Sequence, residues 1–222
     1  MHRILRENGL SIVLVLLMIF FLVGQIVAGM LDYNEDQREH GQPEVSLVSY
    51  LATPHFVEAT TENWESEFLQ MFAFVVLTAC LFQKGSAESK KLDEEEPVDR
   101  DPRKSRKKKD APWPVRKGGL ALTIYEHSLS LAFLLLFLVS FILHAASGAR
   151  EYNADQREHG NAVQVSTMEY MSTSRFWFES FQNWQSEFLA VAAMVVLSIF
   201  LRQKGSPESK PVDSPHSETG KD

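Results

Sequence analysis

The chain has 222 residues, a hydrophobic fraction of 45% and a formal net charge of −7 at pH 7. Its apolar residues gather in uncharged runs, of which residues 8–31 and 128–149 are the longest. A helix of about 20 apolar residues crosses the hydrocarbon core of a bilayer, so this distribution favours a membrane protein over a soluble domain. The single cysteine, Cys80, excludes an intramolecular disulfide.

The two halves of the chain carry the same segments in the same order. The pairs are YNEDQREHG (33–41) and YNADQREHG (152–160), NWESEFL (63–69) and NWQSEFL (183–189), and QKGSAESK (83–90) and QKGSPESK (203–210). Each copy also has a second, shorter uncharged run, at 68–83 and at 188–201. The first apolar run recurs inside the chain, so we interpret it as a transmembrane helix and not as a cleaved signal peptide. The sequence predicts an all-α membrane protein with four transmembrane helices as two tandem parallel two-helix repeats.

The predicted elements follow in chain order from these runs. Repeat one covers residues 1–90, with transmembrane helices at about 8–40 and 56–84. A charged linker covers 91–117. Repeat two covers 118–210, with helices at about 121–159 and 176–204, and a tail covers 211–222. Gly85 and Gly205 follow lysines at the ends of the second helices, which is typical of a helix stop. Two crossings separate the copies, so we expect both to have the same orientation and to pack as a four-helix bundle.

The basic residues predict the orientation. Eighteen of the 22 lysines and arginines lie in the N-terminus, the linker and the tail, against four in the segments 32–67 and 150–187. Short cytoplasmic segments are enriched in Lys and Arg. We therefore expect a protein of the plasma membrane with both termini cytoplasmic.

The linker has two blocks of opposite charge, DEEEPVDRD at 93–101 and RKSRKKK at 103–109. Such composition cannot bury a core, so the linker and the tail are predicted to be disordered. The basic block is expected either to enforce topology alone or to contact anionic lipid, at about 1 kcal/mol per residue near the surface. Its members are Arg103, Lys104, Arg106, Lys107, Lys108 and Lys109. Its acidic flanks and lack of interleaved aromatic residues argue against nucleic-acid binding.

One polar position aligns within the first helix of each copy, as Gln25 and His144. Polar groups at membrane depth usually face the interior of a bundle, and small residues one turn further on, Gly29 and Gly148, allow close approach. Gln25 and His144 are therefore candidates to line a solute or ion pathway. Four helices enclose a narrow pore at best, so such a pathway is expected to require a homo-oligomer.

Polar residues toward the predicted outer boundary recur in both copies. They are Asp36, His40 and Glu67 in the first copy and Asp155, His159 and Glu187 in the second. The first interpretation is a structural hydrogen-bond network across the helix ends. The second is a divalent metal site, since Asp and His at i and i+4 can chelate one ion, although no HExxH or ExxH motif accompanies them. The third is a pathway for a solute or ion.

The duplicated EHG, NWxSEFL and QKGSxESK segments resemble a family of small bacterial integral membrane proteins described only as a domain of unknown function. The resemblance implies a membrane location and a duplicated two-helix unit, and it implies no activity. The sequence also lacks a Gly-rich phosphate loop, a GxSxG and a CxxC motif. We therefore predict a non-enzymatic structural or partner-binding membrane component without a cofactor, with a small transporter or channel subunit as the alternative.

Overall fold

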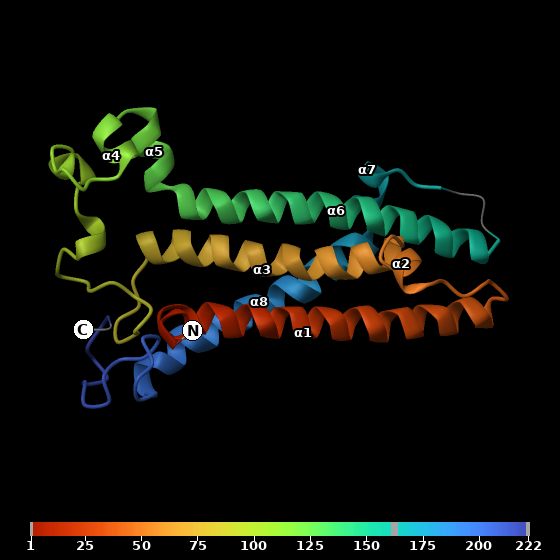
Figure 1. Ribbon diagram of the computed structural model, residues 1–222, viewed down its shortest axis with the longest axis horizontal. Helices are drawn as coiled ribbons and strands as arrows, with labels where there is room; N and C mark the ends of the chain where they lie inside the picture. Colours follow the sequence, from red (N-terminus) through yellow and green to blue (C-terminus); the bar gives the residue numbers. More distant parts are fainter. Residues whose placement is uncertain (1, 161–163, 221–222) are drawn as a thin grey trace. The chain divides into compact units, whose positions relative to one another are not determined.

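The computed structural model describes residues 2–160 and 164–220, and within these ranges it contains helices and turns and no strand. The all-α prediction is therefore confirmed for the described part of the chain. The four long helices are α1 (His2–Glu39), α3 (Pro54–Cys80), α6 (Ser128–Glu158) and α8 (Ser174–Phe200) (Figure 1). A short helix precedes the second long helix of each half, α2 (Leu47–Tyr50) before α3 and α7 (Thr167–Tyr170) before α8.

The helix boundaries differ from the predicted ones at four places. Helix α1 begins at residue 2, and the helix expected from about residue 121 is divided into α5 (Leu120–Glu126) and α6 by a break at His127, whose φ is −110°. Helices α3 and α8 end at Cys80 and Phe200, four residues before the expected ends. The reason lies in the segments that follow, where the backbone N–H of Gln83 donates to Ser89 Oγ and that of Gln203 to Ser209 Oγ, both at 2.9 Å. The QKGSxESK segments are thus separate turns.

Among the described helices, three are long and apolar enough to cross a membrane: Arg6–Glu39 in α1, Ser128–Arg157 in α6 and Ser174–Phe200 in α8. Helix α3 has 27 residues, the same length as α8. Its N-terminal half, however, carries four glutamates between residues 58 and 67, which shortens its apolar part. Membrane association therefore rests on α1, α6 and α8.

The chain forms two compact units. Unit 1 consists of Met1–Thr61 and Ile142–Phe176, and unit 2 consists of Glu62–Phe141 and Trp177–Asp222. Unit 1 contains α1, α2 and α7, the N-terminal parts of α3 and α8, and the C-terminal part of α6. Unit 2 contains the remainder of the long helices, the linker and the described part of the tail.

In unit 2 the linker, which the sequence predicts to be disordered, has short helical turns. Two 3-10 turns, η1 (Pro97–Asp99) and η2 (Pro102–Ser105), each begin with a proline, a residue whose φ suits the first helical position. Helix α4 (Trp113–Lys117) follows and meets α5 through two glycines with positive φ, Gly118 and Gly119. Ala111, Val115 and Leu122, from the end of the linker and from α4 and α5, form a small buried cluster.

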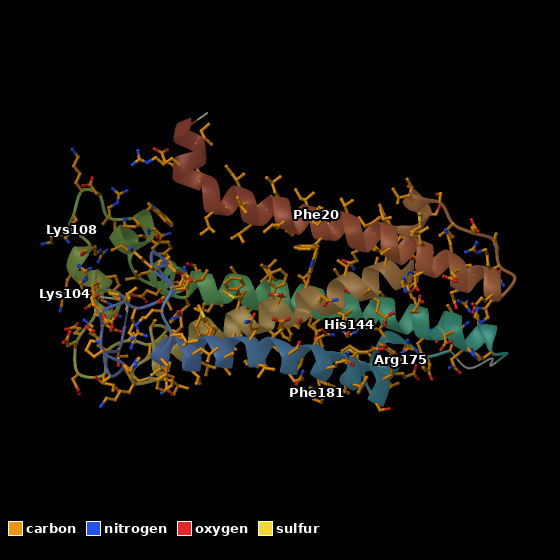
Figure 2. All side chains as sticks on the ribbon, turned by 90° about the horizontal axis from the view of Figure 1, so that it is seen from below. Phe20, Lys104, Lys108, His144, Arg175 and Phe181 are labelled. Carbon is orange, nitrogen blue, oxygen red and sulfur yellow. The ribbon has the colours of Figure 1, made fainter. Side chains whose placement is uncertain are left out.

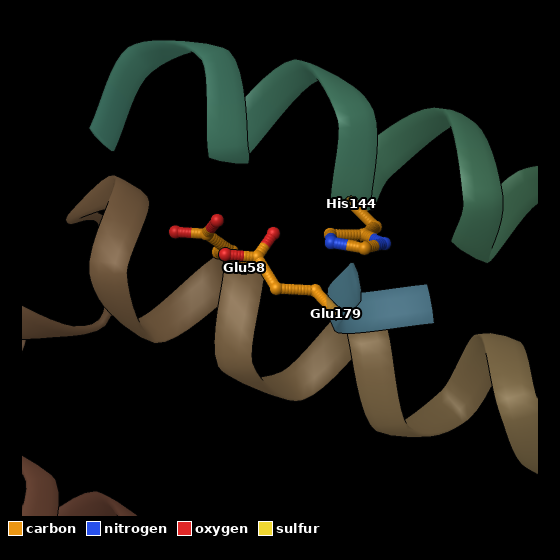
Figure 3. A group of neighbouring side chains, drawn as sticks. All are labelled: Glu58, His144 and Glu179. Carbon is orange, nitrogen blue, oxygen red and sulfur yellow. The ribbon is translucent and has the colours of Figure 1, made fainter. Parts of the chain in front are cut away.

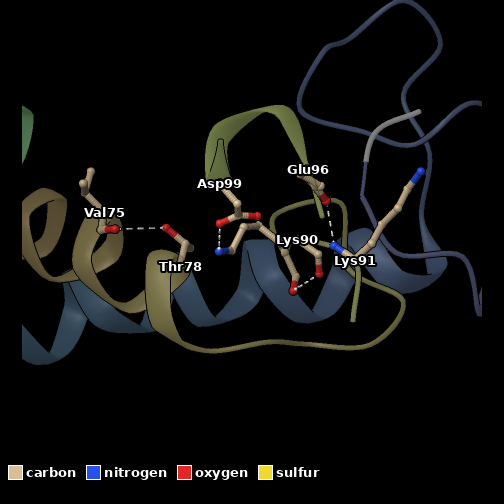
Figure 4. Close-up of polar contacts among 7 residues, drawn as sticks. Val75, Thr78, Lys90, Lys91, Glu96 and Asp99 are labelled. Carbon is tan, nitrogen blue, oxygen red and sulfur yellow. Dashed lines mark hydrogen bonds and ion pairs between the residues drawn. The ribbon is translucent and has the colours of Figure 1, made fainter. Parts of the chain in front are cut away.

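The acidic block of the linker is held by the end of the first QKGSxESK segment (Figure 4). Lys90 Nζ lies 2.6 Å from Asp99 Oδ1, and the backbone N–H of Lys91 donates to Glu96 Oε1 at 2.7 Å. The hydrogen bond from Lys90 lowers the pKa of Asp99 below its usual value. Asp99 and Glu96 therefore have partners outside the basic block that follows them in sequence.

Candidate functional site

The segment after each repeat's first long helix is held by one asparagine. In unit 1, Asn34 accepts a hydrogen bond from the backbone N–H of Val45 at 2.8 Å and donates to its carbonyl at 3.1 Å. Asn153 makes both bonds with Val165, each at 2.8 Å. A carboxamide that satisfies both backbone groups of one residue acts like a neighbouring strand. The asparagine of the YNxDQREHG segment therefore folds the following chain back onto its own helix.

Side chains then cap the short helices. Ser46 Oγ accepts from the backbone N–H of Ser49 at the start of α2, and Ser166 Oγ accepts from that of Glu169 at the start of α7, both at 3.3 Å. At α7 the carboxylate of Glu169 also accepts from the backbone N–H of Ser166 at 2.7 Å, which completes a capping box. Hydrogen bonds from Ser166 lower the pKa of Glu169 below its usual value.

Each short helix ends in a buried tyrosine that lies over a glycine of a long helix. Tyr50 and Tyr170 are 1% and 0% exposed. A Cβ added at Gly29 would lie 2.2 Å from Tyr50 Oη, and a Cβ added at Gly148 would lie 2.6 Å from Tyr170 Cε1. The two glycines are therefore required for close approach, as the sequence predicts, but the group that approaches is a tyrosine ring.

The two tyrosines differ in their polar partners within unit 1. Tyr50 Oη lies 3.2 Å from His55 Nδ1, and Tyr170 Oη donates to Glu58 Oε1 at 3.3 Å. Burial raises the pKa of Tyr50, and the carboxylates of Asp32 and Glu151 raise it further. The first tyrosine thus has an imidazole partner, whereas the second has a carboxylate.

The carboxylate of Glu58 also lies beside His144. Glu58 is 8% exposed and His144 is 0% exposed, and a carboxylate oxygen of one lies within 4.8 Å of a ring nitrogen of the other (Figure 3, which also draws Glu179 of unit 2). The His144 ring packs against Phe176 with a centroid distance of 4.9 Å. At the equivalent position of the first copy, Gln25 donates to Thr60 Oγ1 at 3.2 Å. Both pathway candidates thus have partners within unit 1.

The Asp and His residues predicted near the outer boundary come together in pairs. His40 Nδ1 lies 3.4 Å from Asp36 Oδ1, and His159 Nδ1 lies 3.2 Å from Asp155 Oδ1. Each histidine nitrogen also lies within 3.0 Å of the aspartate's backbone carbonyl oxygen. These side chains are 40–64% exposed, so the pairs contribute little to stability. Their geometry is that of helix-end contacts.

The glutamates predicted to join them, Glu67 and Glu187, belong to unit 2. There the NWxSEFL segments connect α3 to α8, since Trp184 Nε1 donates to Glu65 Oε1 at 2.9 Å and the carboxamide of Asn183 donates to Glu62. Glu65 is fully buried. Within unit 2, Asn183 and Trp184 of the second NWxSEFL segment therefore bind α8 to glutamates of α3.

Sequence reasoning missed the tyrosine position and Glu58. The tyrosines have a detectable signal, because SLVSYLAT (46–53) and STMEYMST (166–173) share Ser, Tyr and Thr at the same spacing. Glu58 has no such signal, because Phe178 occupies the equivalent position in the second copy. Comparison of the two copies therefore finds residues that both copies share, but it cannot find a residue, such as Glu58, that occurs in one copy only.

Long apolar helices, capped turns and buried polar pairs define an all-helical protein with helices able to cross a membrane. The chain belongs to the family described as "Domain of unknown function (DUF6766)", whose model matches residues 1–221. No curated protein and no solved structure matches it.

Proposed function

We propose that the chain is a multi-pass integral protein of the plasma membrane and acts as a non-enzymatic structural or partner-binding component. One observation carries this proposal: the asparagines and tyrosines shared by both copies make their contacts with other parts of the same chain. Asn34 and Asn153 hold backbone groups, and Tyr50 and Tyr170 occupy the space left by glycines. A duplicated set of side chains engaged in this way supports a scaffold.

The proposal includes α3 as a fourth crossing. Its 27 residues span about 40 Å at roughly 1.5 Å per residue, enough for a bilayer core. Three of its four glutamates accept hydrogen bonds, Glu58 from Tyr170, Glu62 from Asn183 and Glu65 from Trp184. Paired carboxylates are tolerated near a membrane boundary. Four crossings bring the basic N-terminus, linker and tail to the cytoplasmic side.

Reporter fusions test this topology. We expect a cytoplasm-active fluorescent reporter to be active after Lys108 and after Asp222, which lies outside the described residues, and an alkaline phosphatase that works only outside the cytoplasm to be active after Gln42. If α3 did not cross, residues 91–117 and the C-terminus would both lie outside. Phosphatase activity at Lys108 would therefore contradict four crossings.

The surfaces left for partners are apolar or basic. Phe20 on α1 is 68% exposed (Figure 2), as expected of a side chain that contacts lipid or another membrane protein. The six basic residues of the block at 103–109 are exposed, and Lys104 and Lys108 extend from the linker in the same view. Because Asp99 and Glu94 pair with Lys90 and Lys91, anionic lipid headgroups are the partner that we propose for the basic block.

A solute or ion pathway is the second candidate function. The observation that favours it is that Gln25 and His144 both make their contacts inside unit 1, from α1 and α6. Polar groups within candidate membrane-spanning helices often mark transport routes. Such a route would be completed by association of several chains.

Flux measurements on proteoliposomes separate the two functions. For a scaffold we expect ion and water permeability equal to that of empty vesicles, both for the purified chain and for its cross-linked oligomer. A pathway predicts permeability that falls in Gln25→Leu and His144→Phe and persists in the control Gln42→Leu, whose side chain is exposed. That pattern would replace the scaffold by a channel or transporter.

A further inference from the structure

We propose that Glu58 and His144 bind a divalent transition-metal ion inside unit 1. This site goes beyond the scaffold contacts, and it differs from the exposed Asp–His pairs in which the sequence suggests a metal. Glu58 comes from α3 and His144 from α6. Both are withdrawn from solvent, at 8% and 0% exposure.

The separation of the two side chains suits one ion. Zinc binds imidazole nitrogen and carboxylate oxygen at about 2.0–2.2 Å in a tetrahedral arrangement, so two ligand atoms on one ion lie about 3.4 Å apart. In the structure the nearest candidate atoms of Glu58 and His144 lie within 4.8 Å of each other. Binding of one ion therefore requires the two groups to move toward each other by at most about 1.4 Å.

Neighbouring groups in unit 1 hold the two side chains in place. Tyr170 Oη donates to Glu58 Oε1, and the ring of Phe176 packs against the imidazole of His144. A Cβ at Gly148 would lie 2.7 Å from Glu58 Oε1, so the carboxylate reaches the backbone of α6 only because this residue is a glycine. Groups that orient ligands in this way commonly change metal affinity by about 10- to 100-fold.

The two copies show that this pair is not required for the shared fold. Gln25 stands where the second copy has His144, and Phe178 stands where the first copy has Glu58. Gln25 satisfies its position with a neutral hydrogen bond to Thr60. A glutamine therefore meets the structural need at this position, and the histidine adds an imidazole ligand opposite a carboxylate. This nitrogen and oxygen set suits Zn²⁺, Fe²⁺ or Mn²⁺ better than Ca²⁺.

The test uses the full chain in detergent, with Zn²⁺ as the probe. The metal content of the purified protein and calorimetric titration with Zn²⁺ after chelation are expected to give about one ion per chain. We expect Glu58→Gln and His144→Gln each to weaken Zn²⁺ binding at least tenfold. His159→Gln, which alters an exposed histidine directly after the end of the same helix, is the matched control and should bind as the parent chain does.

Thermal melting of the metal-free variants serves as the control that each variant is folded. Two results would overturn the proposal. If the parent chain neither contains a transition metal nor binds Zn²⁺, Glu58 and His144 form a buried polar pair and nothing more. If His159→Gln abolishes binding while His144→Gln does not, the metal belongs to the exposed Asp155–His159 pair. His144→Gln is expected to fold, because Gln25 occupies the same position in the first copy.

Discussion

Gly148→Ala is expected to lower the free energy of unfolding by about 1–3 kcal/mol, the usual cost of inserting a methyl group into packed surroundings. Its Cβ would lie 2.6 and 2.9 Å from Cε1 and Cζ of Tyr170 and 2.7 Å from Glu58 Oε1. Tyr170 is fully buried, so its ring has no space into which to move. The control is Gly24→Ala, which meets no atom within 4 Å and should stabilise its helix by up to about 1 kcal/mol.

The first copy provides a sharper form of the same experiment. In Gly29→Ala the added Cβ would lie 2.2 Å from Tyr50 Oη but 3.2 Å from the next nearest atom, Cζ. Removal of the hydroxyl in Tyr50→Phe should therefore recover much of the loss. Tyr170→Phe should recover little of the loss in Gly148→Ala, because ring carbons and Glu58 remain in contact.

Thermal unfolding in detergent, followed by circular dichroism, measures these effects as two double-mutant cycles. The cycles are needed because Tyr50→Phe also removes a hydrogen bond to His55. Equal melting temperatures for Gly148→Ala and Gly24→Ala would show that the tyrosine does not pack on α6 as described. If the Tyr→Phe change recovered the same amount of stability in both copies, contact with the ring carbons of Tyr170 would not be the cause of the loss in Gly148→Ala.

These glycines illustrate what the sequence could predict. Spacing along a helix is local, so the alignment of Gln25 with His144 and the i, i+4 pairing of Asp36 with His40 follow from it directly. A small residue indicates that something approaches closely, but it does not identify the group. Tyr170 reaches Gly148 across 22 residues of chain, through a turn built by Asn153. Such contacts depend on the path of the backbone between them, which periodicity does not contain.

The linker shows a different limit. Composition averages the charges of the acidic block and therefore predicts disorder. The structure assigns individual partners instead, since Asp99 pairs with Lys90 and Glu96 accepts from the backbone of Lys91. Lys90 is the last residue of the duplicated QKGSxESK segment, which the sequence interpretation treated as a helix stop, and Lys91 follows it directly. The turn places Lys90 through hydrogen bonds to serine, such as the one that the backbone N–H of Gln83 donates to Ser89 Oγ.

The same lysine in the second copy has a different environment. Lys210 is 1% exposed, and its ammonium donates to four backbone carbonyls, those of Gly85, Pro215, His216 and Glu218, at 2.6–3.2 Å. The tail is fixed at two more points, where the Gly85 N–H donates to Thr219 Oγ1 at 2.8 Å and the Gly220 N–H donates to Ser86 O at 3.0 Å. Within unit 2, the described tail residues 211–220 are thus fastened to the first QKGSxESK turn, although the sequence predicts a disordered tail.

Lys210→Met is expected to release this tail. Methionine keeps an apolar stem of similar length but removes every donor, so the four carbonyls lose a charged partner. A hydrogen bond to a charged group contributes about 1.5–3 kcal/mol, which corresponds to a roughly 10- to 150-fold change in an opening equilibrium. A glutamate-specific protease should therefore cleave after Glu218 at least ten times faster in Lys210→Met than in the parent chain. Lys204→Met, an exposed lysine of the same turn, is the control and should be cleaved at the parent rate, whereas equal rates for the two variants would contradict the anchoring role of Lys210.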